Sequence, residues 1–302
     1  MLNDTLTAVS GIWVGHWTDF QAQTGCTAVL CPPEGCVASG FALGAAPGSR
    51  EYALLSPEKS VERVHAVLLS GGSAFGLDAA SGVMNWLEQQ GRGFITPFGK
   101  VPIVPAAVIF DLPSGRADIR PDASAGRAAC EGAAAEPVEQ GRVGAGAGAL
   151  IGKYAGFEHA AFGGLGSASV QVGGAVVAAL SVCNAVGDIF DPSSGLRVAG
   201  SSGPPLSSEP HADLAGMNTT LVVVVTDAPL SKAQARMLSQ SAHVGIARVT
   251  RPSHTVHDGD TAFVLSTCEG PEVPLMSLSL AVQEVVAASI VRGVHLANGG
   301  AA

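Results

Sequence analysis

The feature that most constrains the fold of this chain is a leucine followed by four valines, residues 221–225. An apolar run without polar alternation is typical of a strand buried on both faces. The segment before it, residues 191–217, is rich in proline, serine and glycine and predicts a loose linker. The linker therefore enters a core strand through Asn218, Thr219 and Thr220.

The place of Thr219 at this entry indicates a specific chemistry. If the Asn218–Thr219 peptide bond breaks, Thr219 gains a free α-amine beside its hydroxyl, on a rigid strand. An α-amine has a reference pKa of about 8, so it can act as a general base for that hydroxyl near neutral pH. Threonine also starts strands by β-propensity alone, and this structural interpretation stays open for the residue taken by itself.

Composition favours a compact enzyme. The 302 residues are 47% hydrophobic and 14% charged, which permits a large core and excludes extensive disorder. The net charge of −9 argues against a nucleic-acid partner. The N-terminus has no signal-peptide pattern and the apolar runs are too short to span a bilayer, so we expect a cytoplasmic protein without a membrane partner. So few charges also predict a homo-oligomer.

The spacing of three cysteines suggests a metal site. Cys26, Cys31 and Cys36 are evenly spaced, but the chain has no C-x-x-C pair, and His16 is the nearest histidine. We therefore expect reduced thiols, no metal and no cofactor.

Hydrophobic periodicity predicts strands and helices that alternate without an internal repeat. Strands are expected at 64–69, 168–182 (a pair turning at Gly173 and Gly174), 221–225 and 261–266, with an edge or irregular strand within 101–112; helices are expected at 74–90, 124–131, 228–243 (capped by Asp227) and 275–296. Because the strand after Thr219 cannot stand alone, the segments on either side must share one core, so we predict a single domain, 1–302.

Two glycine-rich motifs carry weaker signals. Residues 144–148 resemble a dinucleotide loop but lack its third glycine and its acidic residue, which favours a tight loop beside a pocket. Residues 70–76 suggest a nucleophile elbow around Ser73, but that motif needs a glycine where Phe75 stands. We expect Ser73 to cap a helix, or backbone N–H groups here to bind an oxyanion.

Four polar residues could complete a site around Thr219. Asp258 and Asp260 precede a predicted strand and point to one side of an extended segment, where they could orient the new ammonium, although Asp-Gly is also a turn signal. Lys153 could hold these carboxylates and lower the pKa of the amine, and Asn184 could donate to an oxyanion.

Together, motifs along almost the whole chain resemble one family. They lie at residues 67–77, 101–111, 143–146, 152–153, 184–188, 218–220 and 257–261. They resemble the autoproteolytic peptidases that include L-aminopeptidase/D-Ala-esterase, the β-peptidyl aminopeptidases and the 6-aminohexanoate-oligomer hydrolase of nylon degradation. Several long motifs in the same order make this resemblance specific.

The resemblance implies an α+β fold, a four-layer αββα sandwich like that of N-terminal-nucleophile hydrolases, in a tetramer of cleaved protomers. Self-cleavage between Asn218 and Thr219 would give a large subunit, 1–218, and a small subunit, 219–302. Thr219 falls on the family's nucleophile, Lys153 on its active-site lysine, Asn184 on its oxyanion asparagine, and Asp258 and Asp260 on its acidic relay. Some relatives have a tyrosine where this chain has Phe110, so that hydroxyl is absent here.

The implied activity is that of an aminopeptidase, which releases N-terminal residues from small peptides or amides through an acyl-enzyme and needs no cofactor. Three alternatives stay open. They are an acyltransferase of the ornithine-acetyltransferase type, an endo-acting amide-oligomer hydrolase, and a non-catalytic protein that kept the fold.

Overall fold

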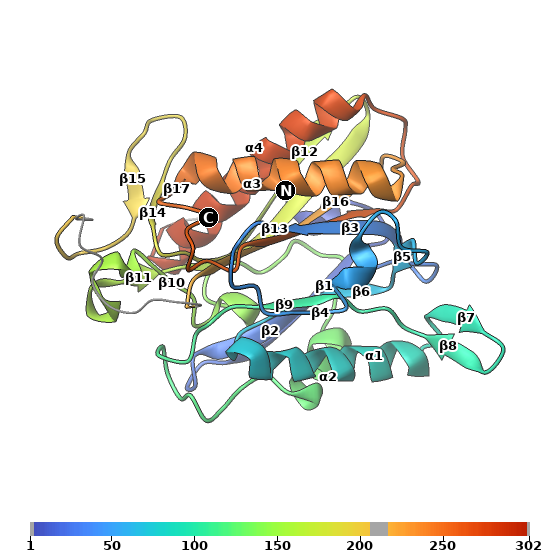
Figure 1. The fold of residues 1–302 in the computed structure, drawn as a ribbon, viewed down its shortest axis with the longest axis horizontal. Helices are drawn as coiled ribbons and strands as arrows, with labels where there is room; N and C mark the ends of the chain where they lie inside the picture. Colours follow the sequence, from blue (N-terminus) through green and yellow to red (C-terminus); the bar gives the residue numbers. More distant parts are fainter. Residues whose placement is uncertain (1–2, 206–216, 301–302) are drawn as a thin grey trace.

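The computed structural model describes residues 3–205 and 217–300 and confirms the four-layer αββα sandwich (Figure 1). One sheet has the strand order β1 (Trp13–Asp19), β2 (Thr24–Leu30), β6 (Ala66–Ser70), β9 (Ala106–Val108) and β4 (Ser49–Arg50). The other has the order β12 (Gly164–Val172), β13 (Ala175–Asn184), β16 (Thr219–Thr226), β18 (Thr261–Ser266), β3 (Cys36–Ala42) and β5 (Arg63–Val64).

Helices form the two outer layers. In Figure 1, α1 (Ala79–Gln89) and α2 (Ala123–Glu131) cover the five-stranded sheet, whereas α3 (Lys232–Val249) and α4 (Leu275–Ala297) cover the six-stranded one. Smaller sheets join β10 (Leu150–Ile151) to β11 (Ala161–Phe162), β7 (Phe94–Thr96) to β8 (Gly99–Val101), and β14 (Asp188–Phe190) to both β15 (Arg197–Ala199) and β17 (Thr250–Arg251). The 3-10 turns are η1 (Leu6–Ala8), η2 (Ala53–Leu55), η3 (Ser73–Asp78), η4 (Gly144–Gly146), η5 (Lys153–Ala155) and η6 (Phe157–His159).

The position of β16 between two hydrophobic clusters explains why its sequence is apolar without interruption. Leu221, Val223 and Val225 pack into the core between the two sheets. Val222 and Val224 pack on the opposite face, against α3 and α4. Each fully buried side chain of this kind contributes about 1.5–3 kcal/mol to stability. The strand lies between β13, its antiparallel neighbour, and β18, its parallel neighbour, so it anchors Thr219 in the middle of a sheet.

Two helix starts differ from the sequence prediction. The third helix is capped by Ser231, whose hydroxyl and Gln234 form a capping box, and it continues to Val249. Asp227 does not cap it, because its carboxylate accepts a hydrogen bond from the amide of Val176 at 2.8 Å. Residues 73–78 form the 3-10 turn η3 and not the first turn of α1, and Ser73 at its start has a positive φ of 54°.

Two extended segments differ in part. Within residues 101–112, Val101 ends β8, residues 102–105 belong to no strand and β9 follows, so the segment is irregular, as one of the two predicted alternatives had it. The other alternative is wrong, because β9 lies between β6 and β4 and is not at an edge. The predicted linker 191–217 begins as a hairpin, because β14 pairs with β15. The Asp191 carboxylate accepts the amides of Ser193 and Ser194 and so closes the turn between them. Residues 206–216 of the predicted linker lie outside the described part of the chain.

The helix α4 contradicts the expectation that every apolar run is too short to cross a bilayer. Among the described helices it alone is long and apolar enough to do so by length and composition. In the fold it packs on the six-stranded sheet, where Val282, Val286 and Ile290 are buried and the Ser289 hydroxyl lies 2.6 Å from that of Ser181. The apolar side chains of α4 therefore pack in the hydrophobic core.

Candidate active site

Strand pairing brings the predicted site residues together. The last residue of β13, Asn184, is the register partner of Thr219, the first residue of β16. On the other side of β16, the segment before β18 runs parallel to it, with a β-bridge between Asn218 and Asp258. Two neighbouring strands therefore deliver an amide and a pair of carboxylates to the start of β16.

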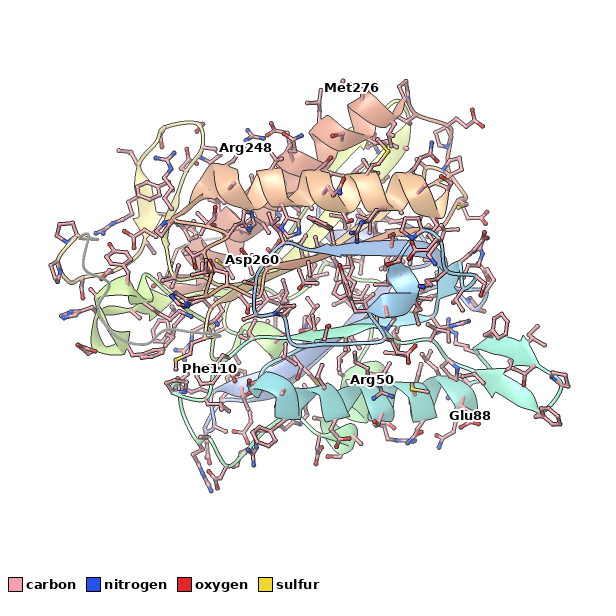
Figure 2. All side chains as sticks on the ribbon, viewed as in Figure 1. Arg50, Glu88, Phe110, Arg248, Asp260 and Met276 are labelled. Carbon is pink, nitrogen blue, oxygen red and sulfur yellow. The ribbon has the colours of Figure 1, made fainter. Side chains whose placement is uncertain are left out.

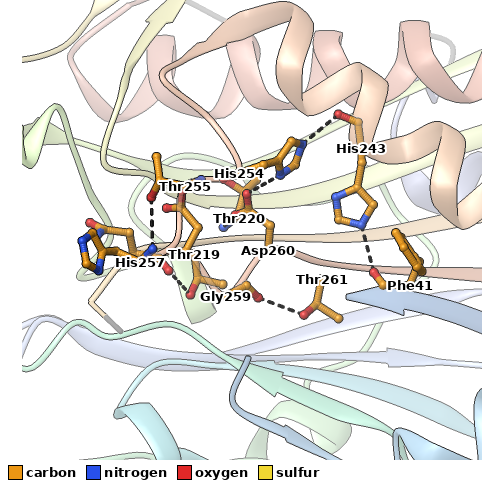
Figure 3. Close-up of polar contacts among 12 residues, drawn as sticks. Phe41, Thr219, Thr220, His243, His254, Thr255, His257, Gly259, Asp260 and Thr261 are labelled. Carbon is orange, nitrogen blue, oxygen red and sulfur yellow. Dashed lines mark hydrogen bonds and ion pairs between the residues drawn. The ribbon is translucent and has the colours of Figure 1, made fainter. Parts of the chain in front are cut away.

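The hydroxyl of Thr219 lies against the peptide bond that precedes it. Its Oγ1 donates to the carbonyl oxygen of Asn218 at 2.5 Å, and the backbone N–H of Gly259 donates to the same oxygen at 2.8 Å. Figure 3 shows Thr219 and Gly259 side by side at this point. The Gly259 amide polarises the carbonyl in the way an oxyanion donor does, and the sequence had not indicated it.

Lys153 and Asn184 converge on the residue before Asn218. Lys153 Nζ donates to the carbonyl oxygens of Asn184 (2.8 Å) and Met217 (2.9 Å). The Asn184 side-chain amide donates to the carbonyls of Met217 (3.3 Å) and Phe110 (3.2 Å), while its Oδ1 accepts the amide of Leu150 at 2.9 Å. Both side chains are therefore fixed, with their donors aimed at the segment that enters β16.

Burial changes the acid–base character of Lys153. The side chain is fully buried, and this desolvation lowers its pKa to about 7, although the nearby carboxylates of Asp258 and Asp260 act in the opposite direction. The lysine therefore exists in part as a free amine near neutral pH, and in that form it can accept a proton.

The two aspartates are almost completely buried, each with 2% of its surface exposed. Asp260 Oδ1 accepts the backbone N–H of Thr220 at 2.6 Å, so it fixes the backbone just after Thr219. Asp258 Oδ2 accepts the amide of Thr255 at 2.6 Å. Burial, and then the charge of Asp260, raise the pKa of Asp258.

A histidine that the sequence had not indicated completes this group. His254 Nδ1 lies 2.7 Å from Asp260 Oδ2, and its Nε2 lies 3.1 Å from the carbonyl oxygen of His243 on α3 (Figure 3). His254 lies only six residues before Asp260 in the sequence, and this short spacing was the available signal.

A small cavity opens beside Thr219. Its volume is about 120 Å³, and it is lined by Ala46, Pro47, Gly48, Ser73, Ala74, Val108, Ile109, Phe110 and Thr219. None of these described residues carries a charged side chain. Figure 2 shows Asp260 and Phe110 between the helical layers, whereas Arg248 and Met276 lie on the outer side of the molecule. A larger hollow of about 470 Å³ between α3 and α4 contains none of the predicted site residues.

The predicted helix cap at Ser73 is absent. Ser73 makes no side-chain cap, and its amide donates to the carbonyl of Ile109 at 2.9 Å. The amide of Gly72 donates to the buried carboxylate of Asp111 at 2.6 Å. Because both N–H groups are already used inside the protein, neither is offered to an oxyanion.

The cysteines are all free thiols. Cys26, Cys31 and Cys36 are buried, and the pKa of the Cys26 thiol is raised, chiefly by burial. Within residues 3–205 and 217–300, no group of three or more histidine, cysteine or acidic side chains is placed to hold a metal ion.

Comparison with known proteins finds one matching family and several relatives. The model of a family described as peptidase family S58 matches residues 4–300. An uncharacterized aminopeptidase of Mycobacterium tuberculosis is 44% identical over 288 residues, which cover 87% of this chain and 81% of that protein. A 6-aminohexanoate-oligomer endohydrolase of a Kocuria species is 32% identical over 219 residues, covering 68% of this chain and 61% of that one.

Among solved structures, the L-aminopeptidase D-Ala-esterase/amidase of Ochrobactrum anthropi has a similar fold, described as a variant of the Ntn hydrolase fold. The TM-score is 0.75 with 19% sequence identity, over 96% of this chain and 85% of that one. At this identity the likeness establishes the fold alone.

Proposed function

The chain belongs to peptidase family S58, and on this premise we propose that it cleaves its own Asn218–Thr219 bond and then acts as an N-terminal-threonine aminopeptidase. The observation that carries the proposal is the 2.5 Å contact from Thr219 Oγ1 to the carbonyl of the bond to be cut. The Gly259 N–H, 2.8 Å from the same oxygen, is placed to stabilise the charge that develops there.

In the first reaction, Thr219 Oγ1 attacks the carbonyl carbon of Asn218 and loses its proton. The C–N bond breaks, the proton passes to the leaving nitrogen, and Thr219 is left with a free amine and an ester to Asn218. Water then hydrolyses the ester and releases the Asn218 carboxylate. Lys153, with its lowered pKa, is the neighbouring group best suited to carry the proton.

In the second reaction, the Thr219 amine takes the proton of its own hydroxyl as Oγ1 attacks the amide carbonyl of a substrate. Asn184, freed from Met217 by the cut, donates to the oxyanion. The leaving amine takes the proton, an acyl-enzyme remains, and water hydrolyses it to regenerate Thr219. The cavity beside Thr219 receives the acyl group.

A second candidate, an amide-oligomer endohydrolase, is favoured by one observation. The described residues that line the cavity include no carboxylate, so a substrate's free α-ammonium has no counter-charge on these walls. The aminopeptidase predicts that alanine p-nitroanilide is hydrolysed and its N-acetyl derivative is not. Hydrolysis of the N-acetyl derivative and of linear amide oligomers, with alanine p-nitroanilide untouched, would select the endohydrolase.

Variants of Thr219 test the proposal itself. Thr219→Ser keeps a hydroxyl and is expected to retain both cleavage and turnover, while Thr219→Ala is expected to lose both. Full turnover by purified Thr219→Ala would overturn the proposal.

We further propose that cleaved protomers assemble into a homotetramer. Exposed apolar side chains on the β7–β8 hairpin support association, since Ile95 is 76% exposed and Phe98 is 100% exposed. Light scattering on the purified protein tests this, and a monomer would contradict it.

A further inference from the structure

The ring of His254 lies between two hydrogen-bond acceptors. Its Nε2 is 3.1 Å from the carbonyl oxygen of His243, and a carbonyl can only accept, so Nε2 carries a hydrogen. Its Nδ1 is 2.7 Å from Asp260 Oδ2. Imidazole is more basic than a carboxylate by its reference pKa, so the proton between them belongs to the ring. Both contacts are therefore satisfied together only by the imidazolium cation.

The charges around this ring require such a cation. Asp258 and Asp260 are two nearly buried carboxylates in one site. Lys153 has a pKa lowered to about 7 by burial, so it supplies only part of a positive charge near neutral pH. His243 packs edge-on against His254 with ring centroids 5.0 Å apart, and burial lowers its pKa, so it stays neutral there. His254, which contacts Asp260, is the remaining cation beside the two carboxylates.

The contacts also form a continuous line to the nucleophile. The carbonyl of His243 on α3 accepts from His254, and His254 donates to Oδ2 of Asp260. The other oxygen of Asp260 accepts the N–H of Thr220, the residue after Thr219. The helix layer is thereby connected to the first residues of β16 through one carboxylate.

We propose that His254 is a positioning residue for Asp260, which it holds as its fixed counter-ion so that Thr220, and with it Thr219, is aligned for attack. This inference rests on the proposed function of Thr219. The imidazolium leaves Lys153 free to give up its proton, because below the pKa of His254 the carboxylate pair still has one cationic partner.

The direction of the pH dependence follows from the contacts. Burial disfavours the charged ring, but the hydrogen bond and the charge of Asp260 outweigh it, and the pKa of His254 is raised above its usual 6.5. The cation is therefore present below this raised pKa and is lost as pH rises through it. Turnover that depends on the aligned Asp260 must fall over the same range.

The variant His254→Asn is suited to test this. Asparagine tolerates the positive φ of 54° at this position, and its amide nitrogen can replace Nδ1 as a donor to Asp260. It lacks the charge and the second contact to His243. The matched control is His257→Asn, in the same loop, because the ring of His257 makes no hydrogen bond to any residue that the structure describes.

Two measurements decide the matter. In the pH profile of alanine p-nitroanilide hydrolysis, we expect His254→Asn to lower kcat roughly ten- to a hundredfold with KM little changed, and to abolish the decline at higher pH. His257→Asn should match the wild type. A His254→Asn profile that superimposes on the wild-type profile would overturn the proposal.

In nitrogen-15 NMR of histidine-labelled wild-type protein, we expect one ring, assigned by its loss in His254→Asn, to carry two N–H protons and to titrate above 6.5. If no histidine ring of the wild type titrates above 6.5, the proposal is overturned, even if the variant fails to fold. The NMR measurement does not depend on enzymatic activity. A wild type that is never cut would refute the proposed function, while the NMR titration would still decide the state of His254.

Discussion

Lys153 Nζ lies 2.9 Å from the carbonyl oxygen of Met217, two residues before Thr219. The side-chain amide of Asn184 contacts the same oxygen at 3.3 Å. In the uncut chain, the Met217 carbonyl thus occupies Lys153 and also the Asn184 amide, which the proposed mechanism assigns to the substrate oxyanion. Cleavage after Asn218 would free both, so the uncut protein is expected to be inactive toward added substrates.

Replacing Lys153 should slow self-cleavage. In Lys153→Met, we expect self-cleavage to slow by roughly a hundredfold, because the group that carries the proton during the attack by Thr219 is lost. Lys232→Met is the matched control, since Lys232 also donates to three backbone carbonyls but lies outside the site. Gel analysis over time measures both, and equal cleavage rates in the two variants would count against a role for Lys153.

The lowered pKa of Lys153 also predicts a pH-dependent stability. Between about pH 7 and about pH 10, the unfolded chain binds a proton at this lysine and the folded chain does not, so stability rises with pH by about 1.4 kcal/mol per unit. Lys153→Met should lack this slope. Urea unfolding of the uncut Thr219→Ala protein, with and without Lys153→Met, measures it; identical slopes would contradict the buried, largely neutral lysine.

Removing the Asn184 amide should reduce turnover more than binding. We expect Asn184→Ala to lower kcat roughly 10²–10³-fold, the usual effect of losing one oxyanion donor. It also leaves the Leu150 amide unsatisfied, at a cost of about 1–3 kcal/mol. Asn298→Ala is the control, because Asn298 likewise donates to two carbonyls but lies at the end of α4. A loss confined to KM would contradict the oxyanion role.

The cavity beside Thr219 should limit the size of the acyl group. Ala74 is exposed and lines this cavity, so Ala74→Phe is expected to raise KM for alanine p-nitroanilide about tenfold through steric exclusion. Self-cleavage should be unchanged, because the substitution leaves the Gly259 N–H that holds the scissile carbonyl in place. The neighbouring Phe75→Ala, outside the lining residues, is the control. An unchanged KM in Ala74→Phe would place the substrate elsewhere.

The sequence predicted those parts of the fold that depend on burial. The run at 221–225 is apolar on both faces because Val222 and Val223 pack into two different hydrophobic clusters. A buried strand of this kind can be predicted from its uninterrupted apolar sequence. The turn at Gly173 and Gly174 was also predictable, because both residues adopt a positive φ that favours glycine.

Parts that depend on long-range partners were not predictable. Asp227 resembles a helix cap in the sequence, but its carboxylate accepts a hydrogen bond from the amide of Val176, 51 residues away. The role of His254 depends on the carbonyl of His243 and on a left-handed backbone in an otherwise ordinary loop. The sequence indicates Asn184 and Thr219 as separate candidate site residues. Only the register of β13 with β16 places them opposite each other.

Identification of the chain ends in purified protein tests the central claim most directly. After incubation, mass spectrometry and N-terminal sequencing should find one chain that ends at Asn218 and another that begins at Thr219, with combined masses equal to the intact chain plus one water. Thr219→Ala should give only the intact chain. A wild-type protein that turns over substrate while remaining uncut, or that is cut at another bond, would contradict the account.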